Sequence, residues 1–193
     1  MSRSNASTIL TGGFCEVWKA RHAGKRVVQK CLRKEYANNP LAQEMLEKGY
    51  LTAYPLQHPG IVTMLDFVLV PQLGRCIVEE YIDGMTLEER IRPGKMTAPE
   101  IERTIRQIAE ALGYLHSKQL THHDLKPANI MITHNGGNVK LTVLGLSRAY
   151  NDATLQPTAG TLRYVAPEVM KGKKTDCRSD IYSLGIIISD MIP

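Results

Sequence analysis

The chain has few of the features that mark secreted or membrane-spanning proteins. Its four cysteines, Cys15, Cys31, Cys76 and Cys177, lie far apart with no paired spacing, so the sequence predicts neither a zinc site nor a disulfide framework. Residues 1–8 are polar, and we expect no signal peptide there. The most apolar run, residues 181–192, contains Ser and Asp and is too short to cross a bilayer. We therefore expect a cytoplasmic protein without membrane contact.

The sequence also has little excess charge of either sign. Charged residues make up 22% of the chain, and the net charge is +5. The densest basic stretch, residues 171–178, contains a glycine and is interpreted as a solvated loop; an acidic partner or nucleic acid is the alternative. We expect no nucleic-acid partner. The 193 residues suffice for one substantial core or for two small lobes around a cleft.

The pattern of apolar residues changes between the two halves of the chain. Strand character is found in two runs on either side of Gly12 and Gly13, and in residues 26–31, 61–70 and 76–78, with helical spacing in residues 40–53. Later, residues 86–91 and 97–116 and the run from Ser179 predict helices, and residues 130–142 a hairpin. We predict an α+β fold over residues 1–193: a five-stranded N-lobe (about 1–80), a hinge (80–84) and a partial, mainly helical C-lobe (85–193).

The loop at residues 122–129 holds polar residues suited to phosphoryl transfer. It reads His-x-Asp-x-Lys-Pro-x-Asn and lies between the long helix and the hairpin. Asp124 could orient and deprotonate a hydroxyl, Lys126 could place a cation at the transferring phosphate, and Asn129 could offer Mg²⁺ a side-chain oxygen. Each residue alone could be an ordinary surface group, but the spacing makes a chance match improbable.

With these motifs in order, the chain resembles the eukaryotic-type Ser/Thr protein kinase family over nearly its whole length. Residues 27–30 correspond to the family's Val-Ala-Ile-Lys, residues 160–168 to the end of its activation segment, and residues 180–185 to the helix whose Asp braces the catalytic loop. The resemblance implies ATP as a possible ligand and a protein as substrate or partner. It also implies a set of nucleotide-binding positions: Lys30 and Gly12 at the phosphates, Glu80 and Ile82 at the adenine edge, and Val17, Val28 and Met131 around the ring.

The most serious departure from the family pattern is Val143. It stands where the family has the metal-binding Asp, and a valine offers no oxygen to Mg²⁺. Asn129 alone is a neutral ligand, so the Mg²⁺ site is doubtful. The Gly-rich loop is also depleted, since Leu10 and Cys15 occupy two of its three glycine places.

Two further departures concern the partner of Lys30. The family's spacing for the helix carboxylate lands on Gly49, and whether Glu47 pairs with Lys30 instead stays open. Glu79 occupies the gatekeeper position, where a buried carboxylate needs a partner. If Glu79 pairs with Lys30, the lysine is diverted from phosphate.

Other departures concern regulation and the end of the chain. His123 replaces an Arg, so we do not expect activation by phosphorylation at Thr158 or Thr161. We expect a C-terminally truncated domain in which Glu168 lacks an ion-pair partner and four isoleucines lack cover; the alternative is a minimal domain that self-associates through its last helix. The four are Ile186, Ile187, Ile188 and Ile192.

The favoured hypothesis is a degenerate, pseudokinase-like domain that binds a protein partner, with ATP as a candidate ligand. The first alternative is a weakly active, ATP-dependent Ser/Thr kinase that phosphorylates protein hydroxyls. The second is a non-functional truncated remnant.

Overall fold

The structure is a computed structural model that describes residues 7–12, 15–94, 96–142, 162–173 and 176–192. The chain divides into two compact units. The first comprises Met1–Leu56 with Thr63–Tyr81, and the second Gln57–Val62 with Ile82–Pro193. The first is built on an antiparallel sheet and the second is mainly helical, which confirms the α+β class.

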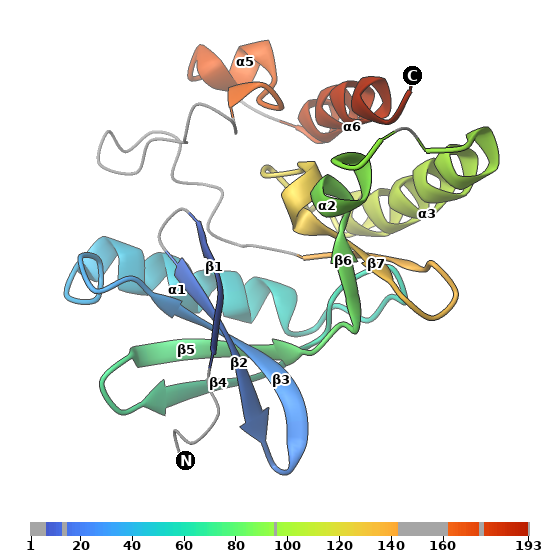
Figure 1. Cartoon of the computed structure of the whole chain (residues 1–193). Coiled ribbons are helices and arrows are strands. Elements are labelled where there is room, and N and C mark those ends of the chain that lie inside the picture. Colours follow the sequence, from blue (N-terminus) through green and yellow to red (C-terminus); the bar gives the residue numbers. More distant parts are fainter. Residues whose placement is uncertain (1–6, 13–14, 95, 143–161, 174–175, 193) are drawn as a thin grey trace. The chain divides into compact units, whose positions relative to one another are not determined.

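The first unit contains a five-stranded antiparallel sheet in the order β1-β2-β3-β5-β4 (Figure 1). The strands are β1 (Ser7–Gly12), β2 (Cys15–His22), β3 (Lys25–Leu32), β4 (Met64–Val70) and β5 (Gly74–Glu80). Ala23 and Gly24 join β2 to β3, and both have positive φ, as a tight hairpin turn requires. All the runs that the sequence favours as strands of this half are present, although β4 begins three residues later than expected.

One helix, α1 (Pro40–Ala53), packs against the sheet and contacts β3, β4 and β5. Asn39 caps its first turn by accepting a hydrogen bond from the backbone N–H of Ala42 (3.1 Å). Pro40 has no N–H group, which costs nothing here because the first turn of a helix offers that group no acceptor. Tyr50 of α1 stacks on Phe67 of β4, with ring centroids 5.2 Å apart. These contacts bury one side of the helix against the sheet.

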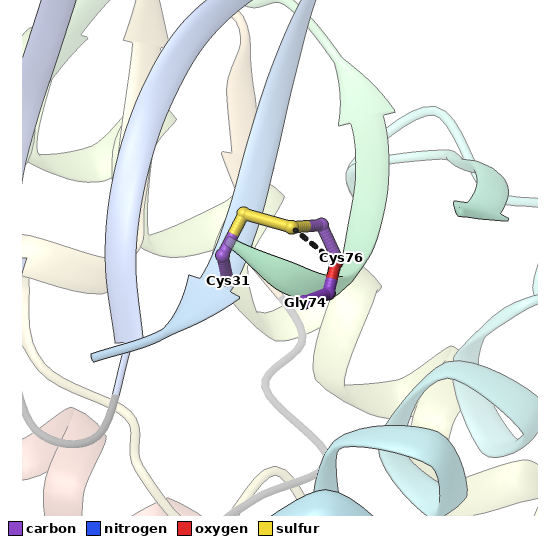
Figure 2. Close-up of a disulfide and its surroundings, with 3 residues drawn as sticks. All are labelled: Cys31, Gly74 and Cys76. Carbon is purple, nitrogen blue, oxygen red and sulfur yellow. Dashed lines mark hydrogen bonds between the residues drawn. A yellow bond between two sulfur atoms is a disulfide. The ribbon is translucent and has the colours of Figure 1, made fainter. Parts of the chain in front are cut away.

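A disulfide between Cys31 of β3 and Cys76 of β5 corrects the expectation that the cysteines stay unbridged (Figure 2). The two residues are 45 positions apart in the sequence, yet they lie opposite each other in the β3–β5 ladder with a Cα–Cα distance of 4.3 Å. Adjacent strands bring opposite residues this close at a non-hydrogen-bonded pair. Spacing along the chain carried no signal of this pairing, because strand register alone creates it.

The second unit begins with β6 (Gly84–Thr86), which pairs with β7 (Ile130–Thr133), and β7 pairs with β8 (Val139–Leu141). The sequence did not predict β6. A Cβ at Gly84 would lie 2.2 Å from the carbonyl oxygen of Ile132, so only glycine allows this close pairing. The β7–β8 hairpin was predicted, and its turn contains Gly136 and Gly137, both with positive φ.

The helices of the second unit are α2 (Leu87–Ile91), α3 (Ala98–Ser117), α5 (Pro167–Met170) and α6 (Cys177–Met191), with a 3₁₀ turn, η1 (Pro127–Asn129) (Figure 1). α3 starts where predicted, and Glu100 accepts a hydrogen bond from the backbone N–H of Thr97 (2.8 Å). Its apolar stripe is buried at Ile108, Ala111, Leu112 and Leu115.

One expectation about the last helix needs correction, namely that all four of its isoleucines lack cover. Ile187 is fully buried, whereas Ile192 is 53% exposed, so α6 already packs one side against its own unit. The carboxylate of Glu168 accepts a hydrogen bond from the hydroxyl of Ser179 (2.9 Å), which is a neutral partner, so the expected lack of an ion-pair partner stays a prediction. No helix of the described part of the chain is both long and apolar enough to span a bilayer.

Candidate active site

The predicted catalytic loop brings its three polar residues together. It runs between α3 and β7 and ends in η1. The Nζ atom of Lys126 lies 3.1 Å from Oδ2 of Asp124. The side-chain amide of Asn129 donates to both the backbone oxygen and Oδ2 of Asp124, each at 2.8 Å. The amide nitrogen of Asn129 is thus committed to Asp124, which leaves Oδ1 as the atom suited to a cation.

Asp180, the first-turn acid of α6, holds the beginning of this loop. Its carboxylate accepts hydrogen bonds from the backbone N–H groups of His122 (2.8 Å) and His123 (3.0 Å). The ring of His116, at the end of α3, lies 2.8 Å from the same carboxylate. Asp180 is only 1% exposed, so these contacts are shielded from water. The bracing role of Asp180 was implied by the resemblance, but nothing in the sequence pointed to His116.

The remaining histidines of the loop have separate structural roles. His122 is buried, and burial lowers the pKa of its imidazole, which therefore stays neutral. His123 adopts a left-handed backbone with φ of +64°, so the chain turns sharply just before Asp124.

At the other end of the loop, the backbone N–H and the hydroxyl of Thr142 donate to the carbonyl of Asn129 (3.0 and 3.2 Å). Val143, the next residue, lies outside the described residues, as do Thr158 and Thr161.

Lys30, the predicted phosphate-binding lysine, lies on β3 in the first unit. In the ladders it is opposite Val17 of β2 and Ile77 of β5, while Val28 is opposite Glu79. Because side chains alternate along a strand, these five residues share one face of the sheet. The sheet therefore gathers Lys30, Val17 and Val28 as the sequence predicts.

The partner of Lys30 is Glu79 rather than a residue of α1. The Nζ of Lys30 lies 2.8 Å from Oε1 of Glu79, and both side chains are buried, at 7% and 3% exposure. Glu47, the alternative partner, lies 3.7 Å from Arg75 instead, and both of these side chains are exposed. The question that the sequence left open is answered in favour of Glu79.

Cys15 occupies one of the glycine places of the predicted phosphate-binding loop. It is 5% exposed and lies opposite Gly12 at the end of the β1–β2 ladder. Burial raises the pKa of its thiol to about 12; the charge of Lys30 acts in the opposite direction and that of Glu79 in the same direction. A neutral, bulky thiol therefore stands where the family has a bare backbone.

The predicted adenine-binding residues are distributed over both units. In the first, Glu80 exchanges backbone and side-chain hydrogen bonds with Thr63: its N–H donates to the Thr63 carbonyl (3.0 Å), and its carboxylate accepts from the Thr63 N–H (2.8 Å). In the second, Ile82 is 9% exposed, and Met131 lies on β7 opposite Thr86 and Lys140.

The comparisons with known proteins agree on one family. Residues 4–193 match the model of the protein kinase domain. A probable serine/threonine-protein kinase of Streptomyces coelicolor is 38% identical, with 94% of this chain and 28% of that protein covered. The probable serine/threonine-protein kinase PknB of Corynebacterium glutamicum is 35% identical (96% and 30% covered), and the serine/threonine-protein kinase PrkC of Bacillus subtilis is 34% identical (94% and 28%). The chain spans less than a third of the length of these relatives. From its sequence motifs, its fold and these matches, the chain belongs to the protein kinase domain family and is related to bacterial serine/threonine-protein kinases.

Proposed function

We propose that this chain is a pseudokinase-like member of its family, which binds an adenine nucleoside or nucleotide without a firmly held metal and acts through a protein partner. Family membership implies ATP binding, whereas phosphate transfer also requires a metal ion that is held by oxygen ligands. The observation that carries it is Val143 at the place of the metal-binding Asp.

The donor set does not fit Mg²⁺. The two positions that the family uses are Asn129, a neutral amide, and Val143, a hydrocarbon. Mg²⁺ requires oxygen ligands in near-octahedral geometry and is normally held by at least one carboxylate. Asp124 supplies the carboxylate of the loop, but it is already paired with Lys126 and accepts a hydrogen bond from the side-chain amide of Asn129. Loss of a metal carboxylate raises the barrier by several kcal/mol, and each 1.36 kcal/mol lowers the rate tenfold.

The competing function is a weakly active Ser/Thr kinase, and the arrangement of the catalytic loop favours it. Asp124 lies within bonding distance of Lys126 and Asn129, and Asp180 holds the loop from the buried side. In this alternative Asp124 accepts the proton of a protein hydroxyl, while Lys126 stabilises the charge of the transferring phosphate. The same network argues against a non-functional remnant, in which nothing would maintain a buried, fully bonded Asp180.

A ligand titration separates these functions. The thermal midpoint of the purified chain is measured with ATP, with and without Mg²⁺. We expect the same midpoint with and without the metal; an additional, Mg²⁺-dependent rise of several degrees would contradict the proposal. Val143→Asp should create metal dependence by restoring a carboxylate, and Val143→Asn, equal in size but uncharged, is the matched control. If Val143→Asp does not respond to Mg²⁺, the loss of metal binding is not confined to this position.

A further inference from the structure

We infer that the tip of the β2–β3 hairpin (residues 19–26) binds an acidic segment of the protein partner, an inference that rests on the proposed function and names the chemistry of that partner. The hairpin lies in a stretch of the chain without acids. Residues 17–34 contain seven Lys or Arg residues and no Asp or Glu, although the net charge of the whole chain is only +5. This stretch is therefore more basic than the average of the chain.

Four of these cations lie at the hairpin tip and are exposed: Lys19 and Arg21 of β2, and Lys25 and Arg26 of β3. Lys19, Arg21 and Lys25 form no ion pair within the described residues. The acid that approaches the tip from β4, Asp66, is instead paired with His22, whose Nε2 lies 3.2 Å from its Oδ2. At least three cations of the tip thus present their charge to solvent.

The register of the sheet makes the tip a two-stranded projection. Among the described residues, the β1–β2 ladder ends at the pair Ser7–Lys19, and the β3–β5 ladder ends at the pair Val27–Glu80. The strands of the hairpin continue beyond both of these neighbours and meet at a tight turn (Figure 1). A partner can therefore approach the tip without displacing another strand of the described sheet.

The pairing within the tip brings like charges together. Arg21 is directly opposite Arg26 in the β2–β3 ladder. Like charges at directly opposite positions destabilise an antiparallel pair. Proteins tend to keep such local conflicts at functional sites, where binding uses what folding alone would avoid. The arrangement favours an anionic partner over a merely solvated surface.

The aromatic residues near the tip argue against a nucleic acid. Proteins hold single strands with cations together with aromatic rings on which bases stack. The ring of Tyr81 already has Lys19 and Arg26 over it, with Nζ 5.5 Å and Cζ 4.7 Å from its centroid. Trp18 lies on the other face of β2, because side chains alternate along a strand. The tip offers positive charge without a stacking platform.

The turn of the hairpin argues against a membrane surface in the same way. Segments that lie on membranes combine Lys and Arg with large apolar side chains that enter the acyl region. The turn consists of Ala23 and Gly24, which have no such side chain. Lys19 and Arg21 are two residues apart on one face of β2, about 7 Å from each other, and an extended peptide with an acid at every second residue has the same spacing. An acidic protein segment fits the tip best.

The test measures binding of a fluorescein-labelled peptide of alternating glutamate and serine by fluorescence anisotropy, without nucleotide or metal. The triple variant Lys19→Gln, Arg21→Gln and Lys25→Gln removes three exposed charges of the tip. We expect it to bind the peptide about tenfold more weakly than the wild type, because three surface ion pairs of ordinary strength are lost.

A matched control removes the same charge from elsewhere on the surface. The triple variant Lys118→Gln, Lys171→Gln and Lys173→Gln replaces three exposed lysines of the second unit, so both variants have the same net charge. Its affinity for the peptide should stay within about twofold of the wild type, because distant exposed charges are screened by salt.

A second measurement on the wild type needs no substitution. Raising the NaCl concentration from about 0.1 M to about 1 M shortens the distance over which exposed charges act from about 10 Å to about 3 Å. We expect the affinity for the peptide to fall at least tenfold over this range. An affinity that does not depend on salt would contradict binding through the cations of the tip.

Three further results would overturn the inference. One is a wild type that does not bind the peptide at the lower salt concentration. Another is an equal loss of affinity in the two triple variants, which would assign binding to net charge. The third is tighter binding of a single-stranded oligonucleotide, or of phosphatidylserine vesicles, than of the peptide. The proposed function fails on a different measurement, the Mg²⁺-dependent rise of the thermal midpoint with ATP, so the two failures are distinguishable.

Discussion

The catalytic loop of the second unit and the β3–β5 strand pair of the first differ in where their charged residues find partners. In the loop, Asp124 has Lys126 and Asn129 beside it, and Asp180 accepts a hydrogen bond from the backbone N–H of His122. On the strands, Lys30 lies on β3, and its partner is Glu79 of the neighbouring strand β5. A residue can thus lie where the sequence predicts it while its charged partner comes from a neighbouring strand and not from the helix.

The largest effect that sharpens this comparison is expected from the disulfide, which occurs only on the strand side. The bond closes a loop of 45 residues, for which chain entropy gives about 4 kcal/mol of stabilisation. Cys31→Ser should lower the free energy of unfolding of the first unit by up to that amount, as measured by denaturant titration under oxidising conditions. Cys177→Ser, at an exposed free cysteine, is the control and should have almost no effect. If both variants unfold alike, the bond does not hold the two strands together.

A comparable effect is expected on the loop side from Asp180→Ala. The substitution leaves the buried N–H groups of His122 and His123 without their acceptor, which should cost about 3 kcal/mol of stability in the second unit. Chemical denaturation measures it. Asp176→Ala, which removes an exposed helix cap four residues earlier, should cost about 1 kcal/mol. Equal losses in the two variants would mean that Asp180 acts only as part of the helix and does not brace the loop.

The smallest effect concerns pH and again distinguishes the loop. Burial lowers the pKa of His122 in the folded chain, so below the ordinary value of about 6.5 the unfolded chain takes up a proton that the folded chain does not. The free energy of unfolding should therefore be highest above that pH, and it should fall by about 1 kcal/mol between pH 6.5 and 5.5. His122→Phe should remove this slope, whereas substitution of the exposed His134 should leave it. An unchanged slope in His122→Phe would assign the acid sensitivity to another group.

Much of the fold could be predicted from the sequence, because the local signals agree with the final structure. Alternating apolar residues, the cap at Thr97 and the glycines of the β7–β8 turn all act over a few residues. The short strand β6 escaped prediction, since three residues carry too little pattern and its pairing depends on a distant strand.

The candidate site divides in the same way. The spacing within residues 124–129 was sufficient to bring Asp124, Lys126 and Asn129 together, because one short loop contains all three. The partner of Lys30 and the disulfide could not be settled from spacing, since both depend on which residues of β3 and β5 face each other. The resemblance named Glu79 as a candidate partner, and the register of the sheet decided between it and Glu47.

The measurement that tests the central claim most directly is transfer of phosphate from ATP to a serine peptide, with Mg²⁺ present, by the purified chain and by Asp124→Asn. Because Val143 offers no metal ligand, we expect no turnover that distinguishes the two proteins. Turnover by the wild type at the ordinary kinase rate of about 1 to 100 per second, abolished in Asp124→Asn, would contradict the account.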